Sequence, residues 1–167
     1  MNIDEDDTKL FRLLEPGEFG IYTQSDELPV SDCPVYLMEG VGGICLSGTA
    51  TVQVFSHRFR IVRGMVLALF PWQLISIKEV SDDFGIRFFR ISHDMFTDTL
   101  SSLWRARPGF FFYMRTHIAS EPREEYVGRF LNFCDLLAYR AENAPVICRR
   151  ELSLIHISEP TRLLSIS

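Results

Sequence analysis

Residues 35–92 contain six or seven short apolar segments, separated by turn residues and uninterrupted by any helical stretch. The segments are 35–38, 44–46, 51–55, 58–62, 65–70, 74–80 and 86–91. Short β segments at near-regular spacing are typical of an antiparallel sandwich or barrel. The segment 65–70 is apolar at every position, so we expect a central strand that something else covers from outside.

Two local features within this region predict a turn and a break in a strand. The pair Ser56-His57 between two segments is a candidate for a tight hairpin turn. The glycine-rich stretch Gly40-Val41-Gly42-Gly43 lies between two β segments, with no helix after it that could bind phosphate. We interpret this stretch as a bulge or bend.

Helical periodicity begins after the last β segment. Apolar residues recur at helical spacing in 93–105, and Arg107-Pro108-Gly109 ends that segment. A second helix is predicted from Glu121 to about Asn143, with a proline and acids in its first turn. We expect the two helices to cover the β structure, the apolar run 110–114 to be buried or paired, and another helical stretch at 146–151.

Acidic residues are concentrated at the start of the chain. Residues 1–32 hold nine Asp or Glu, including the run Asp4–Asp7, against only Lys9 and Arg12. We interpret the run Asp4–Asp7 as a solvated N-terminus, and 1–32 as an irregular arm with one short strand at 19–23. The formal net charge of −5 argues against direct nucleic-acid binding, which needs a basic surface.

The last residues have an unusual sequence. Residues 152–162 read LSLIHISEPTR, which matches, residue for residue, the translation of a transposase adapter used in preparing DNA libraries. Such segments do not contribute to a native fold. We therefore expect 152–167 to be a non-native, frayed tail, and the natural protein to continue past Glu151.

The chain is thus divided into an acidic arm (1–32), a β-barrel (33–92), a helical region (93–151) and the tail (152–167). Within the second helix, apolar residues step by three and four, in a heptad-like pattern. They are Val127, Phe130, Cys134, Leu137 and Ala141. This stripe predicts a homodimer interface.

Three short motifs occur in order along the β region: Leu46-Ser47-Gly48-Thr49-Ala50, Val62-Arg63-Gly64 and Leu69-Phe70-Pro71-Trp72. With the two helices that follow, residues 10–151 resemble the N-terminal domain of AraC-type transcription regulators, in the divergent form found in gut Bacteroidetes. The resemblance implies a mainly β fold, a cupin-like antiparallel β-barrel (double-stranded β-helix) followed by a helical hairpin. It also implies effector sensing and dimerisation. In the family a double helix-turn-helix domain follows; it has no counterpart here, so we expect DNA binding only through that missing domain.

A metal site is not expected. Cupin enzymes hold a metal with two His at H-x-H spacing, a Glu and a distant His, but the four histidines here (57, 93, 117 and 156) form no such pair. Trp72 and Gln73 stand where many cupins have a ligand. The sequence also lacks the nucleophile and phosphate-binding motifs of common enzyme families. We therefore expect a protein without catalytic activity, metal or cofactor.

Small barrels can hold one ligand in their mouth, between aromatic walls and a few polar anchors. The candidate anchors are Tyr36, Gln53, Trp72, Gln73, Arg87 and Arg90. For Arg87 and Arg90 an alternative is an outward position or an ion pair with Glu79 or Asp82. Two other functions stay open: a metal-free cupin binding protein or isomerase, and a pure dimerisation scaffold with a filled barrel.

Cysteine spacing and hydropathy indicate the compartment. Cys33, Cys45, Cys134 and Cys148 form no C-x-x-C pair, and the sequence has no secretory signal. No apolar run approaches the roughly 20 residues needed to cross a bilayer. We expect reduced thiols in a soluble, cytoplasmic protein without membrane segments.

Overall fold

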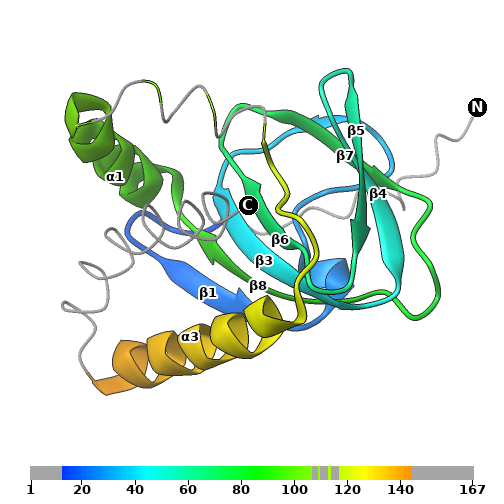
Figure 1. Ribbon diagram of the computed structural model, residues 1–167. Coiled ribbons are helices and arrows are strands. Elements are labelled where there is room, and N and C mark those ends of the chain that lie inside the picture. The colour runs from blue at the N-terminus through cyan, green and yellow to red at the C-terminus, as the bar shows by residue number, and fades with distance from the viewer. Residues whose placement is uncertain (1–12, 107–108, 110–112, 114–116, 144–167) are drawn as a thin grey trace, which may run out of the picture.

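Two antiparallel sheets face one another in the structure, a computed structural model (Figure 1). It describes residues 13–106, 109, 113 and 117–143, without the side chains of 99, 100, 102–106 and 140. Sheet A has the strand order β1-β8-β3-β6, and sheet B has the order β2-β7-β4-β5. All of the strand pairs are antiparallel. The predicted mainly β, cupin-like barrel fold with helices after it is confirmed.

The strands follow the predicted apolar segments closely. They are β1 (Phe19–Tyr22), β2 (Val35–Tyr36), β3 (Gly40–Ser47), β4 (Thr49–Val54), β5 (His57–Val62), β6 (Val66–Leu69), β7 (Leu74–Lys78) and β8 (Gly85–Ile91). The helices are η1 (Ser25–Glu27), α1 (His93–Ala106) and α3 (Glu124–Asn143). Among these described helices, none has the length and apolar character needed to span a bilayer.

Strand alternation builds the core between the sheets. In β4, Ala50, Val52 and Val54 are buried while Thr51 and Gln53 are partly exposed, which is the period-2 pattern of a half-buried strand. Every other strand except β2 supplies buried or partly buried side chains in the same way, and Leu28, Leu37 and Ile118 join from the connections. The result is one apolar cluster between sheets A and B.

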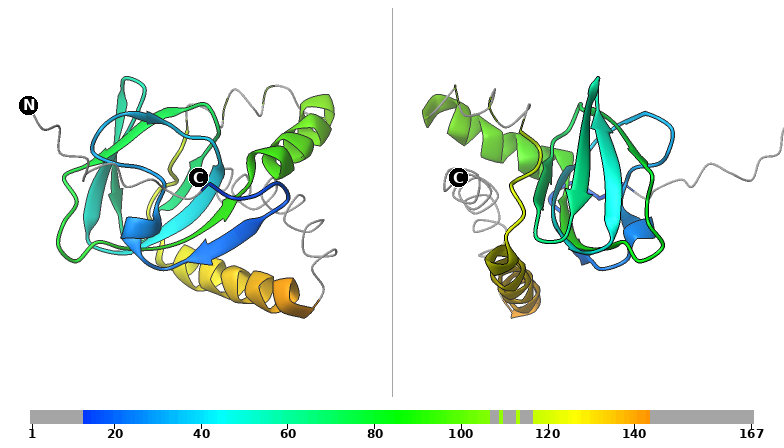
Figure 2. Two further views of the ribbon diagram at one scale, coloured as in Figure 1. Left: turned by 180° about the vertical axis from the view of Figure 1, so that it is seen from behind. Right: turned by 45° about the vertical axis from the view of Figure 1, so that its right-hand side comes forward.

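Helix α3 covers the outer face of sheet A, as Figures 1 and 2 show from three sides. The ring of Phe130 stacks on that of Phe89 in β8, with centroids 6.0 Å apart. Met95 and Phe96, in the first turn of α1, belong to the same cluster. This confirms the expectation that helices after the β region cover its apolar exterior, and it explains why Val66–Leu69 is buried on both faces.

The dimerisation stripe has a different role from the one predicted. Val127, Phe130, Cys134 and Leu137 are all buried in the chain's own core, and Ala141 packs against them. This face is occupied by sheet A, so its area is not available to a second copy. The structure thus corrects the assignment of these five residues to an interface, and homodimerisation itself stays a prediction.

The glycine-rich stretch 40–43 lies within the regular part of β3, so the expected bulge is absent there. The register shifts further along, between Cys45 and Ser47. A Cβ on Gly42 would come within 2.4 Å of the Phe89 ring, and one on Gly43 within 2.9 Å of Phe88 Cβ. Glycine at these positions lets the large side chains of β8 lie across the neighbouring strand.

The end of the acidic arm is part of the sheet. The strand expected at 19–23 is present as β1, which pairs with β8 at the edge of sheet A. Three other expectations fall outside the described residues: those for the run 110–114 apart from Tyr113, the helical stretch 146–151 and the tail 152–167.

Gly64 offers a test of how β5, β6 and α3 are joined. It has φ 81°, and a Cβ there would lie 2.9 Å from the backbone oxygen of Arg123, just before α3. Because both the left-handed backbone and the close backbone contact disfavour a side chain, Gly64→Ala should lower the free energy of unfolding by about 2–3 kcal/mol. Thermal or urea unfolding measures this loss.

Gly128→Ala is the matched control, because Gly128 lies in α3 with no atom within 4 Å of an added Cβ. That substitution should stabilise the protein by about 0.5–1 kcal/mol, the helix-propensity difference between the two residues. Equal midpoints for the two variants would contradict the close contact at Gly64.

Candidate functional site

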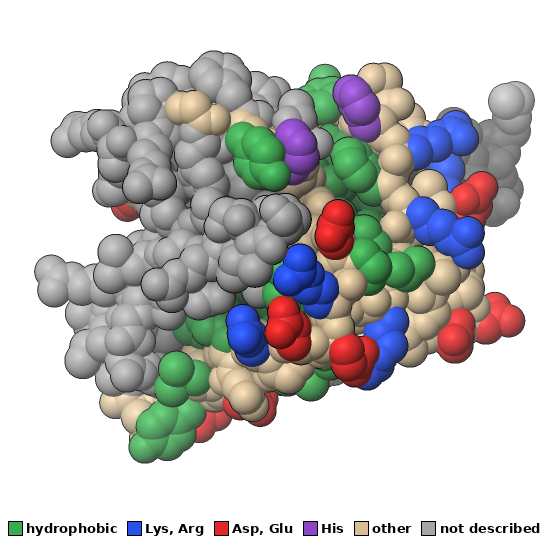
Figure 3. Space-filling view, in the orientation of Figure 1, with side chains coloured by type: hydrophobic (Ala, Val, Ile, Leu, Met, Phe, Trp, Pro, Cys, Tyr) green, Lys and Arg blue, Asp and Glu red, His purple; other side chains and the backbone are tan. Residues whose placement is uncertain are grey.

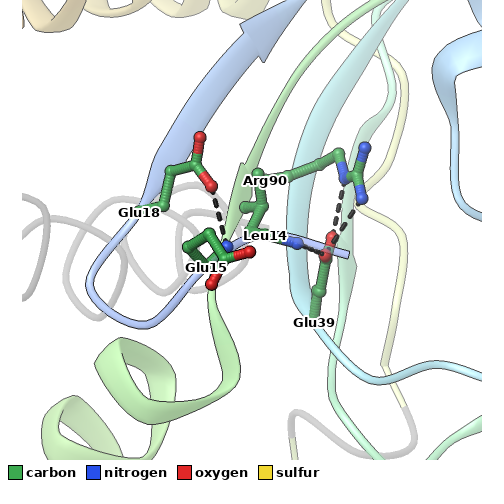
Figure 4. A network of polar contacts seen from close by, with 5 residues as sticks. All are labelled: Leu14, Glu15, Glu18, Glu39 and Arg90. Carbon is green, nitrogen blue, oxygen red and sulfur yellow. Dashed lines mark hydrogen bonds and ion pairs between the residues drawn. The ribbon is translucent and has the colours of Figure 1, made fainter. Parts of the chain in front are cut away.

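A buried ion pair lies at one end of the barrel (Figure 4). Arg90, near the end of β8, is 5% exposed, and Glu39, just before β3, is 2% exposed. Arg90 Nε donates to Glu39 Oε2 at 2.7 Å, and Arg90 Nη2 donates to Oε1 at 3.0 Å. This is a bidentate ion pair, the geometry in which a guanidinium binds a carboxylate most specifically.

The same carboxylate holds the N-terminal arm. The backbone N–H of Leu14 donates to Glu39 Oε1 at 2.7 Å, and a turn follows in which the N–H of Glu15 donates to Glu18 Oε2 at 2.7 Å. Glu39 therefore connects β8 to the arm through one side chain, as Figure 4 shows.

Tyr22 of β1 lies beside Arg90 on the side of the site away from Glu39's carboxylate contact. Its ring lies 5.3 Å from the guanidinium carbon of Arg90 and stacks on Phe88, with centroids 5.3 Å apart. Burial raises the pKa of the Tyr22 hydroxyl, and the charge of Arg90 partly opposes the rise. The guanidinium thus sits between a carboxylate and an aromatic face.

A second set of contacts ties the arm to the start of α1. The N–H of Gly17 donates to Ser92 Oγ at 3.1 Å and to Asp94 Oδ1 at 3.0 Å, and Ser92 Oγ donates to Asp94 Oδ1 at 2.6 Å. The Ser92 hydrogen bond, together with backbone N–H groups, lowers the pKa of Asp94. The arm, the end of β8 and the first turn of α1 therefore form one connected unit.

Of the six predicted anchors, the structure brings only Arg90 to this site. Gln73 is buried, but its Oε1 accepts a hydrogen bond from the N–H of Phe70 at 2.8 Å and closes the β6–β7 turn. Trp72 in the same turn is 57% exposed, and Tyr36 is 63% exposed. Gln53 faces outward on sheet B, where its Nε2 donates to the Phe55 carbonyl.

Arg87 points the opposite way from Arg90, toward α3. Its Nη2 lies 3.8 Å from Asp135 Oδ1, and its Nε is buried without a hydrogen-bond partner. Burial raises the pKa of the neighbouring Cys134 thiol to about 11, against the opposing effect of Arg87. The ion-pair partners suggested from sequence, Glu79 and Asp82, are thus replaced by Asp135 for Arg87 and Glu39 for Arg90.

Sequence reasoning missed Glu39, Tyr22 and Leu14. The alternation of side chains along β8 could have shown that Arg90 points inward. Ile86 and Phe88 are apolar and lie on the same face of the strand as Arg90, which is the interior face. Nothing comparable marks Glu39, because it lies outside the strands.

Among the described residues, no group of three His, Cys, Asp or Glu side chains is placed to hold a metal ion. His57 is exposed at the start of β5, His93 lies edge-on to Trp72, and His117 stacks on Tyr113. The chemistry that the barrel end offers is recognition of a carboxylate by a buried guanidinium, with an apolar interior beside it.

Comparison with known proteins supports the fold. No protein-family model and no curated protein matches the chain. Among solved structures, it is similar to ToxT from Vibrio cholerae O395 bound to (E)-4-(8-methylnaphthalen-1-yl)but-3-enoic acid, with a TM-score of 0.50 and 11% identity over 87% of this chain and 55% of that one. The chain therefore spans about half the length of that neighbour.

Weaker likenesses are found to two other structures. The Clostridium difficile EutQ protein has a TM-score of 0.33 and 14% identity over 49% of this chain and 77% of its own. Wild-type ToxT from Vibrio cholerae strain SCE256, bound to an unsaturated fatty acid, has a TM-score of 0.34 and 16% identity over 50% of this chain and 32% of its own.

Proposed function

We propose that this chain is the effector-sensing domain of an AraC-type transcription regulator, with its effector bound at the barrel end that Arg90 and Glu39 occupy. The observation that carries the proposal is the buried Arg90–Glu39 pair, which holds β8 and the arm together. The fold shared with ToxT, an AraC-family regulator, supports the assignment.

The chemistry of the site favours an apolar carboxylic acid as effector. The carboxylate of such a ligand would compete with Glu39 for Arg90, since both present two oxygens to the same guanidinium. Its hydrocarbon part would lie against Tyr22 and the apolar interior. The ligand named in the ToxT structure is itself a small aromatic acid, which is consistent with this class.

The mechanism would be a shift between two conformations. A ligand that binds Arg90 in place of Glu39 favours the state in which Glu39 no longer holds Leu14. Because Gly17 is bonded to Ser92 and Asp94, release of the arm would change the contacts at the start of α1. In a complete regulator, such a change would reach the DNA-binding domain through the helices.

Thermal shift with matched ligands tests this function. At a free concentration of 100 times Kd, a ligand should stabilise the protein by about 2.7 kcal/mol, which for a chain of this size raises Tm by roughly 5–10 °C. Naphthyl- and long-chain carboxylic acids should give this shift, and their primary alcohols should not.

The variant Arg129→Met, on the exposed side of α3, should keep the response, whereas Arg90→Met should lose it. A folded protein that responds to none of the acids, or equally to acids and alcohols, would contradict the proposal.

The remaining parts of the proposal concern the whole protein. We propose a cytoplasmic homodimeric regulator of the Bacteroidetes type, without catalytic activity, whose natural sequence departs from this one after Glu151, where the adapter-like residues begin. Resequencing of the locus tests this: codons for a double helix-turn-helix domain are expected in place of 152–167. Gel filtration with light scattering tests the dimer.

A further inference from the structure

An exposed apolar strip lies on sheet B at the same end of the barrel as Arg90 and Glu39. Four large side chains are well exposed there: Tyr36 (63%), Met38 (36%), Phe55 (41%) and Trp72 (57%). We call these four residues the lip.

Backbone pairing brings the lip residues together. Tyr36 pairs with Leu74, the N–H of Leu37 bonds the Gln73 carbonyl, and the N–H of Phe55 bonds the Leu74 carbonyl. Met38 and Trp72 therefore lie opposite one another beyond Tyr36 and Leu74. Strand alternation places Tyr36 on the outer face of sheet B, since Val35 pairs with Ile75, which points inward with 0% exposure. Phe55 and Trp72 lie in the turns at this end of the sheet, and the ring of Trp72 lies edge-on to that of His93, with centroids 5.4 Å apart.

Basic side chains continue this face away from the lip. The register sets Arg58 beside Gln53 and Ser76, and it sets Arg60 beside Thr51 and Lys78. Arg58, Arg60 and Lys78 are exposed. We call these three residues the basic rows. Lys and Arg side chains are visible on the side of the molecule where β4 and β5 run (Figures 1 and 3).

Few acids balance the basic rows. Glu79 lies beside them and accepts a hydrogen bond from Thr51 at 2.7 Å. Among the described residues, no acidic side chain forms an ion pair with Arg58, Arg60 or Lys78. Three cations and one acid leave this part of the face with a net positive charge of two.

We infer that the outer face of sheet B is the docking surface for the chain's own first twelve residues. The chain enters the described part at Leu13, which is 54% exposed, and Leu14 is held by Glu39, the neighbour of Met38 in sequence. Residues 1–12 therefore start beside the lip.

The length of residues 1–12 and the order of their apolar and acidic residues match the outer face of sheet B. Extended chain rises about 3.3 Å per residue, so a fully extended segment would carry Phe11 and Leu10 to about 10–13 Å from Leu14. A fully extended segment would carry Asp4–Asp7 to about 23–33 Å from Leu14, while the seven residues from Trp72 to Lys78 span about 20 Å of the face. Apolar residues thus meet the lip, and the acidic run reaches the basic rows.

The covalent connection of residues 1–12 to the domain favours their binding over that of a separate acidic protein. A segment joined through a few residues has an effective concentration in the millimolar range, so weak contacts are enough to hold it. The attraction between Asp4–Asp7 and the basic rows is exposed to solvent, and salt should therefore weaken it.

Acrylamide quenching of Trp72 tests the docking in the full-length chain. Trp104→Phe removes the other tryptophan, so that all indole emission comes from the lip. In this background, joint replacement of Asp4, Glu5, Asp6 and Asp7 by the corresponding amides should raise the quenching constant about twofold at low salt, since the electrostatic term is lost. Arg58→Glu with Arg60→Glu should give the same rise.

The control replaces two exposed acids of α3, Glu125→Gln with Glu142→Gln, on the side of sheet A, and should leave the quenching constant unchanged. An amide-substituted segment that protects Trp72 as well as the parent does would overturn the inference. Protection that disappears on dilution of the protein would also overturn it, because the occupant would then be a second copy. Effector binding does not enter this readout, so the outcome is independent of the proposed function.

Discussion

Replacement of Arg90 by methionine is expected to lower the free energy of unfolding by about 3–5 kcal/mol, the usual loss when one member of a buried ion pair is removed. Glu39, which is 2% exposed in the structure, would then keep the N–H of Leu14 as its one hydrogen-bond donor among the described residues. The loss comes from the unpaired carboxylate and not from missing volume, because methionine fills much of the same space.

Thermal and urea unfolding measure this effect, and for a chain of this size Tm should fall by roughly 6–20 °C. The double variant Glu39→Leu with Arg90→Met should be more stable than Arg90→Met alone, since no buried charge is left unpaired. Arg129→Met removes an exposed arginine of α3 and should change stability by less than about 0.5 kcal/mol. Equal stabilities of Arg90→Met and Arg129→Met would show that the pair is not buried in solution.

The β part of the fold could be predicted because its signals are local. Strand periodicity and turn residues occur within a few positions of each strand, so the ends of 51–55 agree with those of β4 to within two residues, and the ends of 65–70 agree with those of β6 to within one. The β4–β5 turn shows the limit of such signals. Its two residues are Phe55 and Ser56, one position earlier than predicted, and Phe55 adopts φ 52°, which a phenylalanine rarely does.

The site could be predicted only in part, because its partners are far apart in sequence. Glu39 and Arg90 are separated by 51 residues. No local pattern shows that the residue before β3 meets the end of β8; the strand order has to be known first. Arg87 and Arg90 illustrate the same point, since they are equally plausible ligands in the sequence but lie on opposite faces of β8.

The stripe on α3 was open to two interpretations for a physical reason. Apolar residues at three- and four-residue steps suit a coiled-coil seam, and they suit a helix packed on a sheet equally well. The choice depends on whether another apolar surface within the chain lacks a cover. The outer face of sheet A, with Ile44, Ala68 and Phe89, is such a surface.

Phe130→Ala should therefore unfold the chain more easily and should leave its oligomeric state unchanged. Phe130 is 7% exposed, and its ring contacts those of Phe89 and Phe133, with centroids 6.0 and 6.2 Å away. Truncation of a buried phenylalanine costs about 3–5 kcal/mol, through lost burial and the cavity left behind. We expect urea unfolding to show that loss.

Tyr139→Ala is the matched control on the same helix, because Tyr139 is 65% exposed and should contribute less than about 0.5 kcal/mol. Light scattering under native conditions separates the two roles of the stripe. An interface role predicts a lower mass for Phe130→Ala at nearly unchanged stability. A core role predicts the parent's mass with reduced stability, because the side chain supports α3 on sheet A and its loss loosens the protomer itself.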